Sequence, residues 1–284
     1  MNGVLVIDKP AGLSSAAVVA RVKRALAVDR AGHGGTLDPI ATGVLAVCLG
    51  AATKLAQYLL ADDKGYEADA LLGVETDTLD RTGAVTAEHP VAVTREAVLA
   101  ALARRTGEHE QVPPMYSAIK QDGVPLYARA RAGETVERAP RTVRIRSLEL
   151  LAFEPPRFRI AIACSKGTYV RSLVADLGSD LGCGAHLTEL RRTRSGRFTL
   201  ADAVPLEAVA ELAAARLIAP SAALSLPVVR VPDALVPRIV AGQQLPVTVL
   251  GTTESHFQIV GPAGELRAVA HAEDGRVVYE RVWA

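Results

Sequence analysis

The amino-acid sequence predicts an α+β fold, with a mixed or antiparallel sheet flanked by helices and loops and a small β-rich domain at its end. Residues 66–74 and 158–164 alternate apolar and polar side chains, as half-buried strands do. Residues 14–26 and 94–105 repeat apolar residues at helical spacing behind a Ser or Thr that can cap a helix. After residue 227, short β-like runs are separated by glycine-containing turns.

The first half of the chain gives a strand, a helix, a loop and a second strand in turn. Gly3–Ile7 is a short apolar run, and Ser14 or Ser15 is a natural cap for the helix that follows. Residues 31–43 hold four glycines and one proline, which predicts a loop. Residues 43–49 are apolar and predict a strand, and residues 53–61 predict a helix.

Three later segments set the expected domain organisation. Residues 107–140 are rich in Gly, Pro, Arg and Tyr without strong periodicity, which is typical of a functional insertion. Residues 205–217 predict a helix, and two prolines and two serines make residues 220–227 the expected linker. We therefore expect a first domain over residues 1–219 and a small β domain over 228–284, with VTVL among the strands of the latter.

The charge distribution suggests local basic patches on a nearly neutral chain. The formal net charge is +1, which is not the signature of a protein that coats nucleic acid at random. Residues 104–146, however, carry nine Lys and Arg residues against five Asp and Glu. Such a patch can meet phosphates, although scattered solvated charges would give the same count.

Cysteine spacing and hydropathy exclude several classes of protein. Cys48, Cys164 and Cys183 form no C-x-x-C pair, which argues against a disulfide framework and a zinc site. Residues 75–80 bunch three carboxylates but fail the EF-hand spacing, so we predict no metal site there. No apolar run is long enough to cross a bilayer or to form a signal peptide, which predicts a cytoplasmic location.

The loop around Asp38 is the first candidate for chemistry. Its glycines permit close approach of the backbone to a ligand, and Pro39 restricts Asp38 to extended conformations. A carboxylate is thereby presented on a loop of defined shape, although an Asp-Pro pair also caps ordinary turns. The glycines are not followed by Lys and Ser or Thr, so the loop is not a nucleotide-binding P-loop.

Two further segments carry arginines at positions where they can act. Arg171 lies just inside a predicted helix after Lys166-Gly167-Thr168-Tyr169, and can pair with a carboxylate elsewhere in the fold. Such a partner favours the charged form of an Asp. Arg191 and Arg192 form a pair suited to phosphates, a weak signal on its own.

Taken together, these segments resemble the TruB family of tRNA pseudouridine synthases. The matching strings are GVLVIDKPAGLSS, GHGGTLDPIATGVL, KGYEA, PPMYSAIKQDGVPLYARARAG, SKGTYVRSL and GAHLTELRRTRSG. They occur in that family's order over roughly residues 3–215, and the combination is highly specific. Gly34 and Ser14 stand where Thr is usual, and both are small residues. The C-terminal part is more loosely similar to the reduced PUA-like domain of bacterial members.

The resemblance implies an activity and a set of site residues. The family converts uridine 55 in the T-arm of tRNA to pseudouridine without cofactor or metal. For this chain we expect a monomer that needs no obligatory protein partner. The family's nucleophile falls on Asp38, its active-site tyrosine on Tyr66 and its arginine on Arg171. The substrate-binding positions implied by the same motifs are His33, Lys9, Lys166, Tyr169 and Leu190. Our candidates for phosphate contacts are Arg129, Arg131, Arg141, Arg191 and Arg192.

Some alternatives stay open at this point. Asp38 could attack C1′ of the ribose or C6 of the uracil, and Tyr66 could stack on the base, accept a proton from C2′, or both. A guide-dependent isomerase inside a ribonucleoprotein belongs to the same superfamily, but its members generally carry longer C-terminal extensions. A non-catalytic RNA-binding module is a third possibility, against which the matched Asp38, Tyr66 and Arg171 argue.

Overall fold

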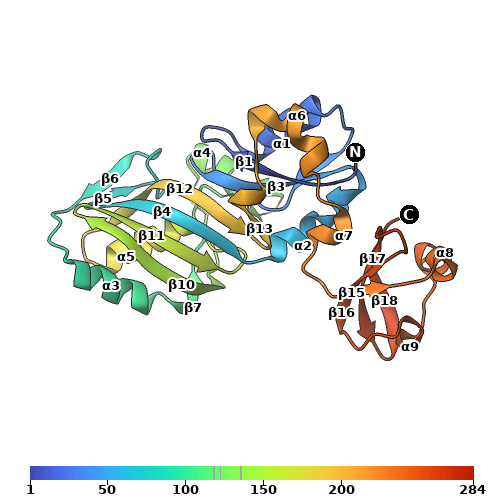
Figure 1. Ribbon diagram of the computed structural model, residues 1–284. Coiled ribbons are helices and arrows are strands. Elements are labelled where there is room, and N and C mark those ends of the chain that lie inside the picture. The colour runs from blue at the N-terminus through green and yellow to red at the C-terminus, as the bar shows by residue number, and fades with distance from the viewer. Residues whose placement is uncertain (118, 122, 135) are drawn as a thin grey trace. The chain divides into compact units, whose positions relative to one another are not determined.

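The chain folds into two compact units. The structure, a computed structural model, describes residues 1–117, 119–121, 123–134 and 136–284, without the side chains of residues 120, 125 and 131. The first unit comprises residues 1–39, 44–61 and 196–284, and the second comprises residues 40–43 and 62–195. A large mixed sheet and a small C-terminal β sheet, with helices around them, confirm the α+β prediction (Figure 1).

The N-terminal part of the first unit is built on strands β1 (Gly3–Lys9) and β3 (Thr42–Leu49). Helix α1 (Ser15–Ala25) begins where expected, and the Ser14 side chain accepts a hydrogen bond from the Ala17 amide. The glycine-rich stretch is not wholly a loop as predicted, because Ala31–His33 forms strand β2 antiparallel to β3. Backbone pairing with an apolar strand overrides the weak strand preference of glycine there.

The remaining elements of this part include a helix that the sequence predicted, at Val209–Arg216. Residues 220–227 are not an open linker, because Ala223 and Leu224 are buried in the core of the first unit. The elements are η1 (Gly50–Leu55), α2 (Ala56–Ala61), β13 (Phe198–Thr199), η2 (Leu200–Asp202), β14 (Val204–Pro205), η3 (Leu206–Ala208), α6 (Val209–Arg216) and α7 (Pro220–Ala223).

The small sheet has the strand order β15-β16-β17-β18. Its strands are β15 (Val228–Arg230), β16 (His256–Val260), β17 (Leu266–Glu273) and β18 (Arg276–Val282). Residues 247–250, expected as a strand, form the short helix α9 (Val247–Leu250) behind Pro246 instead. The other helices here are η4 (Asp233–Leu235) and α8 (Val236–Val240). A run of four β-branched or apolar residues, such as VTVL, is too short for its pattern to indicate whether it forms a strand or one turn of helix.

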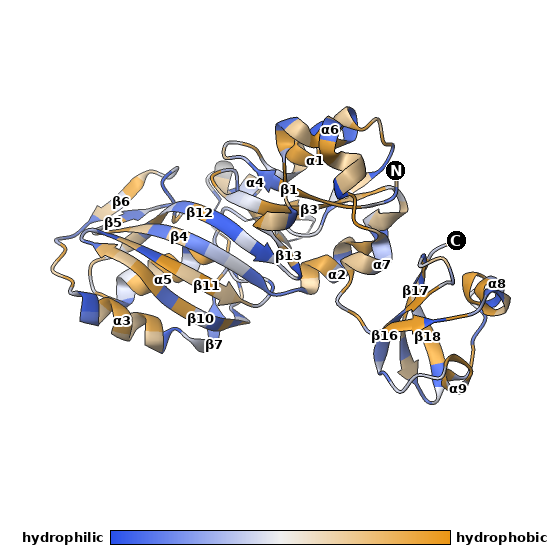
Figure 2. Cartoon of the chain, viewed as in Figure 1, coloured by the Kyte–Doolittle hydropathy of each residue, from blue (hydrophilic) through white to orange (hydrophobic). Residues whose placement is uncertain are grey.

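The second unit carries five long or medium strands in the order β12-β4-β11-β10-β7, all antiparallel to their neighbours. They are β4 (Lys64–Leu72), β7 (Gly107–Gln111), β10 (Arg141–Glu154), β11 (Arg157–Cys164) and β12 (Ala185–Ser195). Buried and more exposed residues alternate along β4 from Tyr66 to Leu72, whereas the second half of β12 is hydrophilic throughout (Figure 2). The buried set is packed beneath α3 (Arg95–Arg104) and α5 (Val170–Asp180), and β5 (Val74–Thr76) and β6 (Val85–Glu88) form a hairpin.

The predicted insertion begins later than expected. Residues 107–111 are not irregular but form the edge strand β7, whose polar sequence gives no strand signal and whose hydrogen bonds come from β10. Beyond it lie β8 (Lys120–Gln121), β9 (Val124–Pro125) and the one-and-a-half-turn helix α4 (Leu126–Arg131). The segment from residue 112 to residue 140 therefore starts directly at the sheet edge.

Candidate functional site

The glycine loop of the first unit owes its shape to two glycines that the packing requires. The Gly34 amide donates to the Ala46 carbonyl at 2.9 Å, and a Cβ at Gly34 would lie 2.6 Å from the Cβ of Leu59. Gly35 has a φ of 143°, which a side chain disfavours, and its amide donates to Nδ1 of His33 at 3.4 Å. His33 is thus half-buried and turned back onto its own loop.

Both chain neighbours of Asp38 are clamped. The Ser15 hydroxyl donates to the Leu37 carbonyl at 3.1 Å and accepts from the Leu37 amide at 2.8 Å. On the other side, the Pro39 carbonyl accepts from the Gly12 amide at 2.8 Å and from Nζ of Lys9 at 3.4 Å.

Lys9 itself is fully buried and also donates to the Pro10 carbonyl at 2.9 Å. Because both flanking peptides are fixed, the half-buried Asp38 carboxylate is held on a rigid backbone.

Tyr66 and Leu190 lie on neighbouring strands of the second unit. Tyr66, on β4, is buried and is paired in register with Ile162 on β11 and with Arg192 on β12. Leu190 is buried on β12, opposite Ala68. Tyr66, predicted to stack on the base, and Leu190, predicted to bind the substrate, therefore lie on two strands that are hydrogen-bonded to each other.

Arg171 is a buried cation of the second unit whose guanidinium is held by backbone carbonyls. It lies in the first turn of α5 and is only 3% exposed. One Nη donates to the Thr78 carbonyl at 3.1 Å and the other to the Tyr116 carbonyl at 2.8 Å. Two hydrogen bonds that point in different directions, each to a backbone carbonyl, fix the plane of the guanidinium. The planar group of an arginine can be oriented in this way, whereas the ammonium group of a lysine cannot.

Asp80 is a residue of this site that the sequence reasoning missed. Its carboxylate lies 3.9 Å from Nε of Arg171, and its side chain is 7% exposed. Oδ1 accepts from the Thr78 hydroxyl at 2.9 Å, the Thr82 amide at 2.9 Å and the Thr82 hydroxyl at 2.6 Å. The spacing of the carboxylates over residues 75–80 gives no sign of this buried ion pair, because Arg171 lies far along the chain.

The turn before α5 is also firmly held. Arg141 donates to the Gly167 carbonyl and its guanidinium lies 4.7 Å from the centre of the Tyr169 ring. Gln111 makes two hydrogen bonds to the backbone of Tyr169. Lys166 lies at the exposed start of the same turn. Lys166, Tyr169 and Arg171 are thereby brought together on one short segment of the chain.

The five arginines expected to contact phosphates occupy different environments. Arg192 is only 1% exposed, which corrects the expectation of a surface phosphate ligand, because alternation along β12 turns it inward. Arg141 uses its guanidinium on Gly167 and Tyr169, as described. Arg191 donates to the Thr42 hydroxyl at 3.4 Å, and Arg129 lies 3.7 Å from Glu134. The side chain of Arg131 lies outside the described residues.

Burial perturbs one further cation close to Tyr66 in the chain. Desolvation of Lys64, and then the positive charge of Arg192, lower the pKa of this lysine to about 8. Its Nζ donates to the Asp62 carbonyl at 2.8 Å. Lys64 lies opposite Ser195, and Arg192 lies opposite Tyr66, so two buried cations occupy nearby positions on the neighbouring strands β4 and β12. Their mutual repulsion disfavours the charged form of Lys64.

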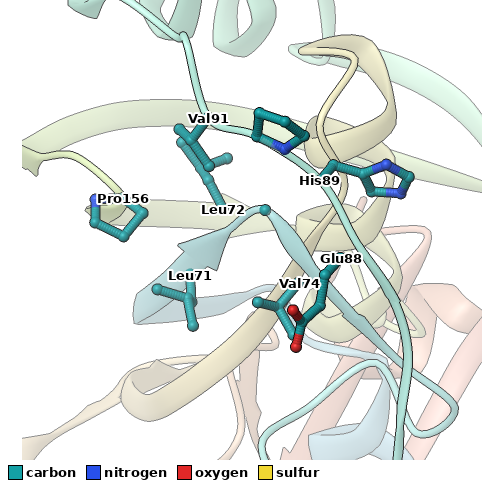
Figure 3. A pocket seen from close by; sticks show the side chains of 9 residues that line it. Leu71, Leu72, Val74, Glu88, His89, Val91 and Pro156 are labelled. Atoms are coloured by element: carbon teal, nitrogen blue, oxygen red, sulfur yellow. The ribbon is translucent and has the colours of Figure 1, made fainter.

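A pocket elsewhere in the second unit involves none of the predicted site residues (Figure 3). Its volume is about 470 Å³, and it is lined by Leu71, Leu72, Gly73, Val74, Glu88, His89, Pro90, Val91 and Pro156. Among the residues that the structure describes, no three His, Cys, Asp or Glu side chains are grouped as metal ligands would be. Within the same residues, no helix is both long and apolar enough to cross a membrane.

Comparisons with known proteins agree with this arrangement. The profile of the TruB family pseudouridylate synthase N-terminal domain matches residues 23–170, and that of the tRNA pseudouridylate synthase B C-terminal domain matches residues 171–224. A tRNA pseudouridine synthase B of Stutzerimonas stutzeri is 55% identical over 75% of this chain and 70% of its own. One of Burkholderia lata is 48% identical over 99% of this chain and 90% of its own.

A solved structure has the same fold. In a crystal structure of a Cbf5-Nop10-Gar1 complex, one chain superposes with a TM-score of 0.79 at 29% identity, covering 99% of this chain and 84% of that one. The fold and the sequence matches define a pseudouridine synthase, which is an isomerase. Within that class, the chain belongs to the TruB family.

Proposed function

We propose that this protein converts uridine 55 in the T-arm of tRNA to pseudouridine. The bond between N1 of the base and C1′ of the ribose breaks, the base turns, and a bond from C5 to C1′ replaces it. C5 loses its hydrogen as a proton and N1 gains a proton, so the product is an isomer of the substrate. The proposal is supported by the relatives named tRNA pseudouridine synthase B, which match most of this chain. The structural observation that carries it is the Asp38 carboxylate held between two clamped peptides.

Three residues have proposed roles in the chemistry. Asp38 is the nucleophile, and whether it attacks C1′ or C6 is a question for trapping experiments. Tyr66 provides a flat face for the extruded base, which must first leave its stack at a cost of a few kcal/mol. Arg171 is the cation that keeps Asp38 ionised, and its guanidinium is already oriented by Thr78, Tyr116 and Asp80. No step needs a metal or a cofactor.

We also propose how the remaining candidates bind RNA. His33, Lys166, Tyr169 and Leu190 hold the extruded nucleotide, and Lys9 supports the loop from within. Among the candidates for phosphate contacts, Arg129, Arg131 and Arg191 keep that role. Each phosphate neutralised adds somewhat less than one unit to the slope of log affinity against log salt. An affinity for the T-arm that is flat between low and moderate salt would contradict this assignment.

The division of labour along the chain follows from the same proposal. Residues 1–219 perform the chemistry, the segment over residues 112–140 closes over the RNA, and the small PUA-like part over residues 228–284 assists binding. The protein acts as a monomer in the cytoplasm without an obligatory protein partner. Hydrogen exchange of residues 112–140 with and without RNA tests the closure, and equal protection in both states would contradict it.

The direct experiment is incubation with an unmodified T-arm stem-loop, followed by mapping of pseudouridine. Formation at the single position that corresponds to uridine 55 is the expected result. The leading alternative is a guide-dependent isomerase, favoured by the fold shared with a chain of the Cbf5-Nop10-Gar1 complex. Activity of the purified chain on the stem-loop alone, with no guide RNA or added protein, rules that alternative out. Binding without conversion would instead indicate an RNA-binding module.

A further inference from the structure

Gln111 is a buried amide that grips the backbone of another segment at two points. It ends the edge strand β7 and is 3% exposed. Its Oε1 accepts from the Tyr169 amide at 2.8 Å, and its Nε2 donates to the Tyr169 carbonyl at 3.0 Å. The primary amide thus pairs with one residue as a neighbouring strand would, using both of its hydrogen-bonding groups. A shorter or apolar side chain cannot reproduce this pairing.

The gripped residue is the cap of the helix that carries Arg171. Tyr169 immediately precedes α5 and has no capping hydrogen bond from its own side chain. Its carbonyl accepts the first helical hydrogen bond, from the Leu173 amide at 3.1 Å, as well as the bond from Gln111. Fixing the Tyr169 peptide therefore fixes the start of α5, and Arg171 follows two residues later.

The same turn of α5 holds the first residues beyond β7. The Ser172 hydroxyl donates to the Val112 carbonyl at 3.2 Å, and Arg171 donates to the Tyr116 carbonyl at 2.8 Å. Together with Gln111, these contacts join residues 111–116 to residues 169–172 at three successive places. A displacement of the segment that follows β7 is thereby transmitted to the guanidinium of Arg171.

We propose that Gln111 is a positioning residue for the isomerisation, acting through Arg171. It ties the root of the segment over residues 112–140 to the first turn of α5, so that the Arg171 guanidinium is oriented only when this root is in place. The inference rests on the proposed function, because it uses the role assigned there to Arg171. The inference goes beyond the proposed function in two ways. It names a further residue that positions Arg171, and it connects the predicted RNA-binding segment physically to the proposed catalytic residues.

The test uses the full-length chain and two matched substitutions. Gln111→Leu keeps the approximate volume and removes both hydrogen bonds to Tyr169. The control is Thr142→Val, on the neighbouring strand, which removes an exposed cross-strand hydrogen bond to Glu110 of 2.7 Å that does not reach α5. If Gln111→Leu fails to fold, Gln111→Glu retains an acceptor for the Tyr169 amide, replaces the donor with a second carboxylate oxygen and adds a negative charge.

We expect Gln111→Leu to slow single-turnover pseudouridine formation at saturating enzyme by roughly tenfold or more, with RNA affinity within about threefold of wild type. The Tyr169 amide should exchange its hydrogen faster, whereas Thr142→Val should change neither quantity. A purely structural role would produce the same loss in any background. We therefore expect the loss to shrink to less than about threefold when Arg171→Lys is already present.

Two outcomes would overturn the inference: a wild-type rate for Gln111→Leu, or an undiminished loss in the Arg171→Lys background. Failure of the proposed function looks different, because the wild-type chain itself would then form no pseudouridine. Exchange at the Tyr169 amide would still report whether Gln111 fixes the start of α5. Unchanged protection there would refute the positional part on its own.

Discussion

The buried ion pair between Asp80 and Arg171 predicts a separation of chemistry from binding. Asp80→Asn keeps the size of the side chain and the Oδ1 acceptor that receives bonds from Thr78 and Thr82. It removes only the negative charge beside Nε of Arg171, 3.9 Å away. The two hydrogen bonds from Arg171 to backbone carbonyls remain available.

The size of the effect follows from this geometry. At 3.9 Å and an effective dielectric constant of about 20, the gross attraction of the two charges is about 4 kcal/mol. Desolvation of two buried ions offsets much of that attraction, and the neutral amide itself incurs less desolvation. We therefore expect the free energy of unfolding to fall by about 1 to 2 kcal/mol. In Asp80→Asn the Nε edge of the Arg171 guanidinium loses its charged partner and is held less firmly. Single-turnover isomerisation should therefore slow by about tenfold or more.

The assay compares three quantities for wild type and Asp80→Asn. These are the urea midpoint, the dissociation constant for the T-arm stem-loop, and the single-turnover rate at saturating enzyme. Thr82→Val is the control, because it removes a hydrogen bond to Asp80 and leaves the charge in place. An Asp80→Asn protein that is folded, binds RNA and reacts at the wild-type rate would refute the reasoning. A stability loss well above 4 kcal/mol would refute the magnitude.

Three further predictions concern the proposed nucleophile Asp38, the buried Trp283 near the C-terminus, and the buried cation Lys64. Asp38→Asn should abolish pseudouridine formation while RNA affinity stays within roughly tenfold, or about 1.4 kcal/mol; substantial turnover by the folded variant would overturn the mechanism. Trp283→Ala removes a buried ring whose Nε1 donates to the Ala51 carbonyl at 3.1 Å and should lower unfolding free energy by about 3 to 5 kcal/mol. A loss below about 1 kcal/mol in denaturant unfolding would contradict that packing, and Trp283→Phe is its milder control. Because the pKa of Lys64 is lowered to about 8, its charge destabilises the fold at neutral pH, and this cost is relieved as pH rises from about 8 towards 10.5. Wild type should therefore gain stability relative to Lys64→Met over that range, and parallel stability curves for the two proteins would show that the shift is absent.

The sequence predicted the elements whose pattern is local and periodic. The alternation at residues 158–164 predicted strand β11, and the helix predicted behind the Thr94 cap is α3, whose two ends each lie within one residue of the prediction. The sequence predicted a loop of defined shape around Asp38, and hydrogen bonds to Ser15 and Gly12 fix the peptides on either side of that residue. These features depend on residues close in the chain, which is why a single sequence suffices for them.

The features that the sequence could not give depend on distant partners. Strand β7 has no hydrophobic pattern and exists through its pairing with β10. Asp80 is one of three carboxylates in a short stretch of sequence. It differs from the other two because Arg171, which lies 91 positions later in the chain, approaches it in the folded structure. The inward direction of Arg192 follows from the register of β12 with β4, which its own neighbours do not specify.

The basic residues of the matched motifs lead to a more general point about this protein. Lys9 donates to Pro10 and Pro39, Arg141 to Gly167, and Arg171 to Thr78 and Tyr116, and every one of these acceptors is a backbone carbonyl. Each cation thus fixes a loop or turn next to a proposed catalytic residue. A motif rich in Lys and Arg therefore need not be a surface for phosphates, which is consistent with a net charge of only +1.

This division has a consequence for the salt dependence of RNA binding. If Lys9, Arg141 and Arg171 hold loops while Arg129, Arg131 and Arg191 meet phosphates, then only the latter three should contribute to the salt slope. Replacing Arg191 by Gln should lower the slope by somewhat less than one unit. Replacing Arg141 by Gln should leave the slope unchanged and slow the single-turnover rate instead, because it loosens the turn at Gly167 and Tyr169. Equal changes of slope for the two variants would show that Arg141 meets RNA after all.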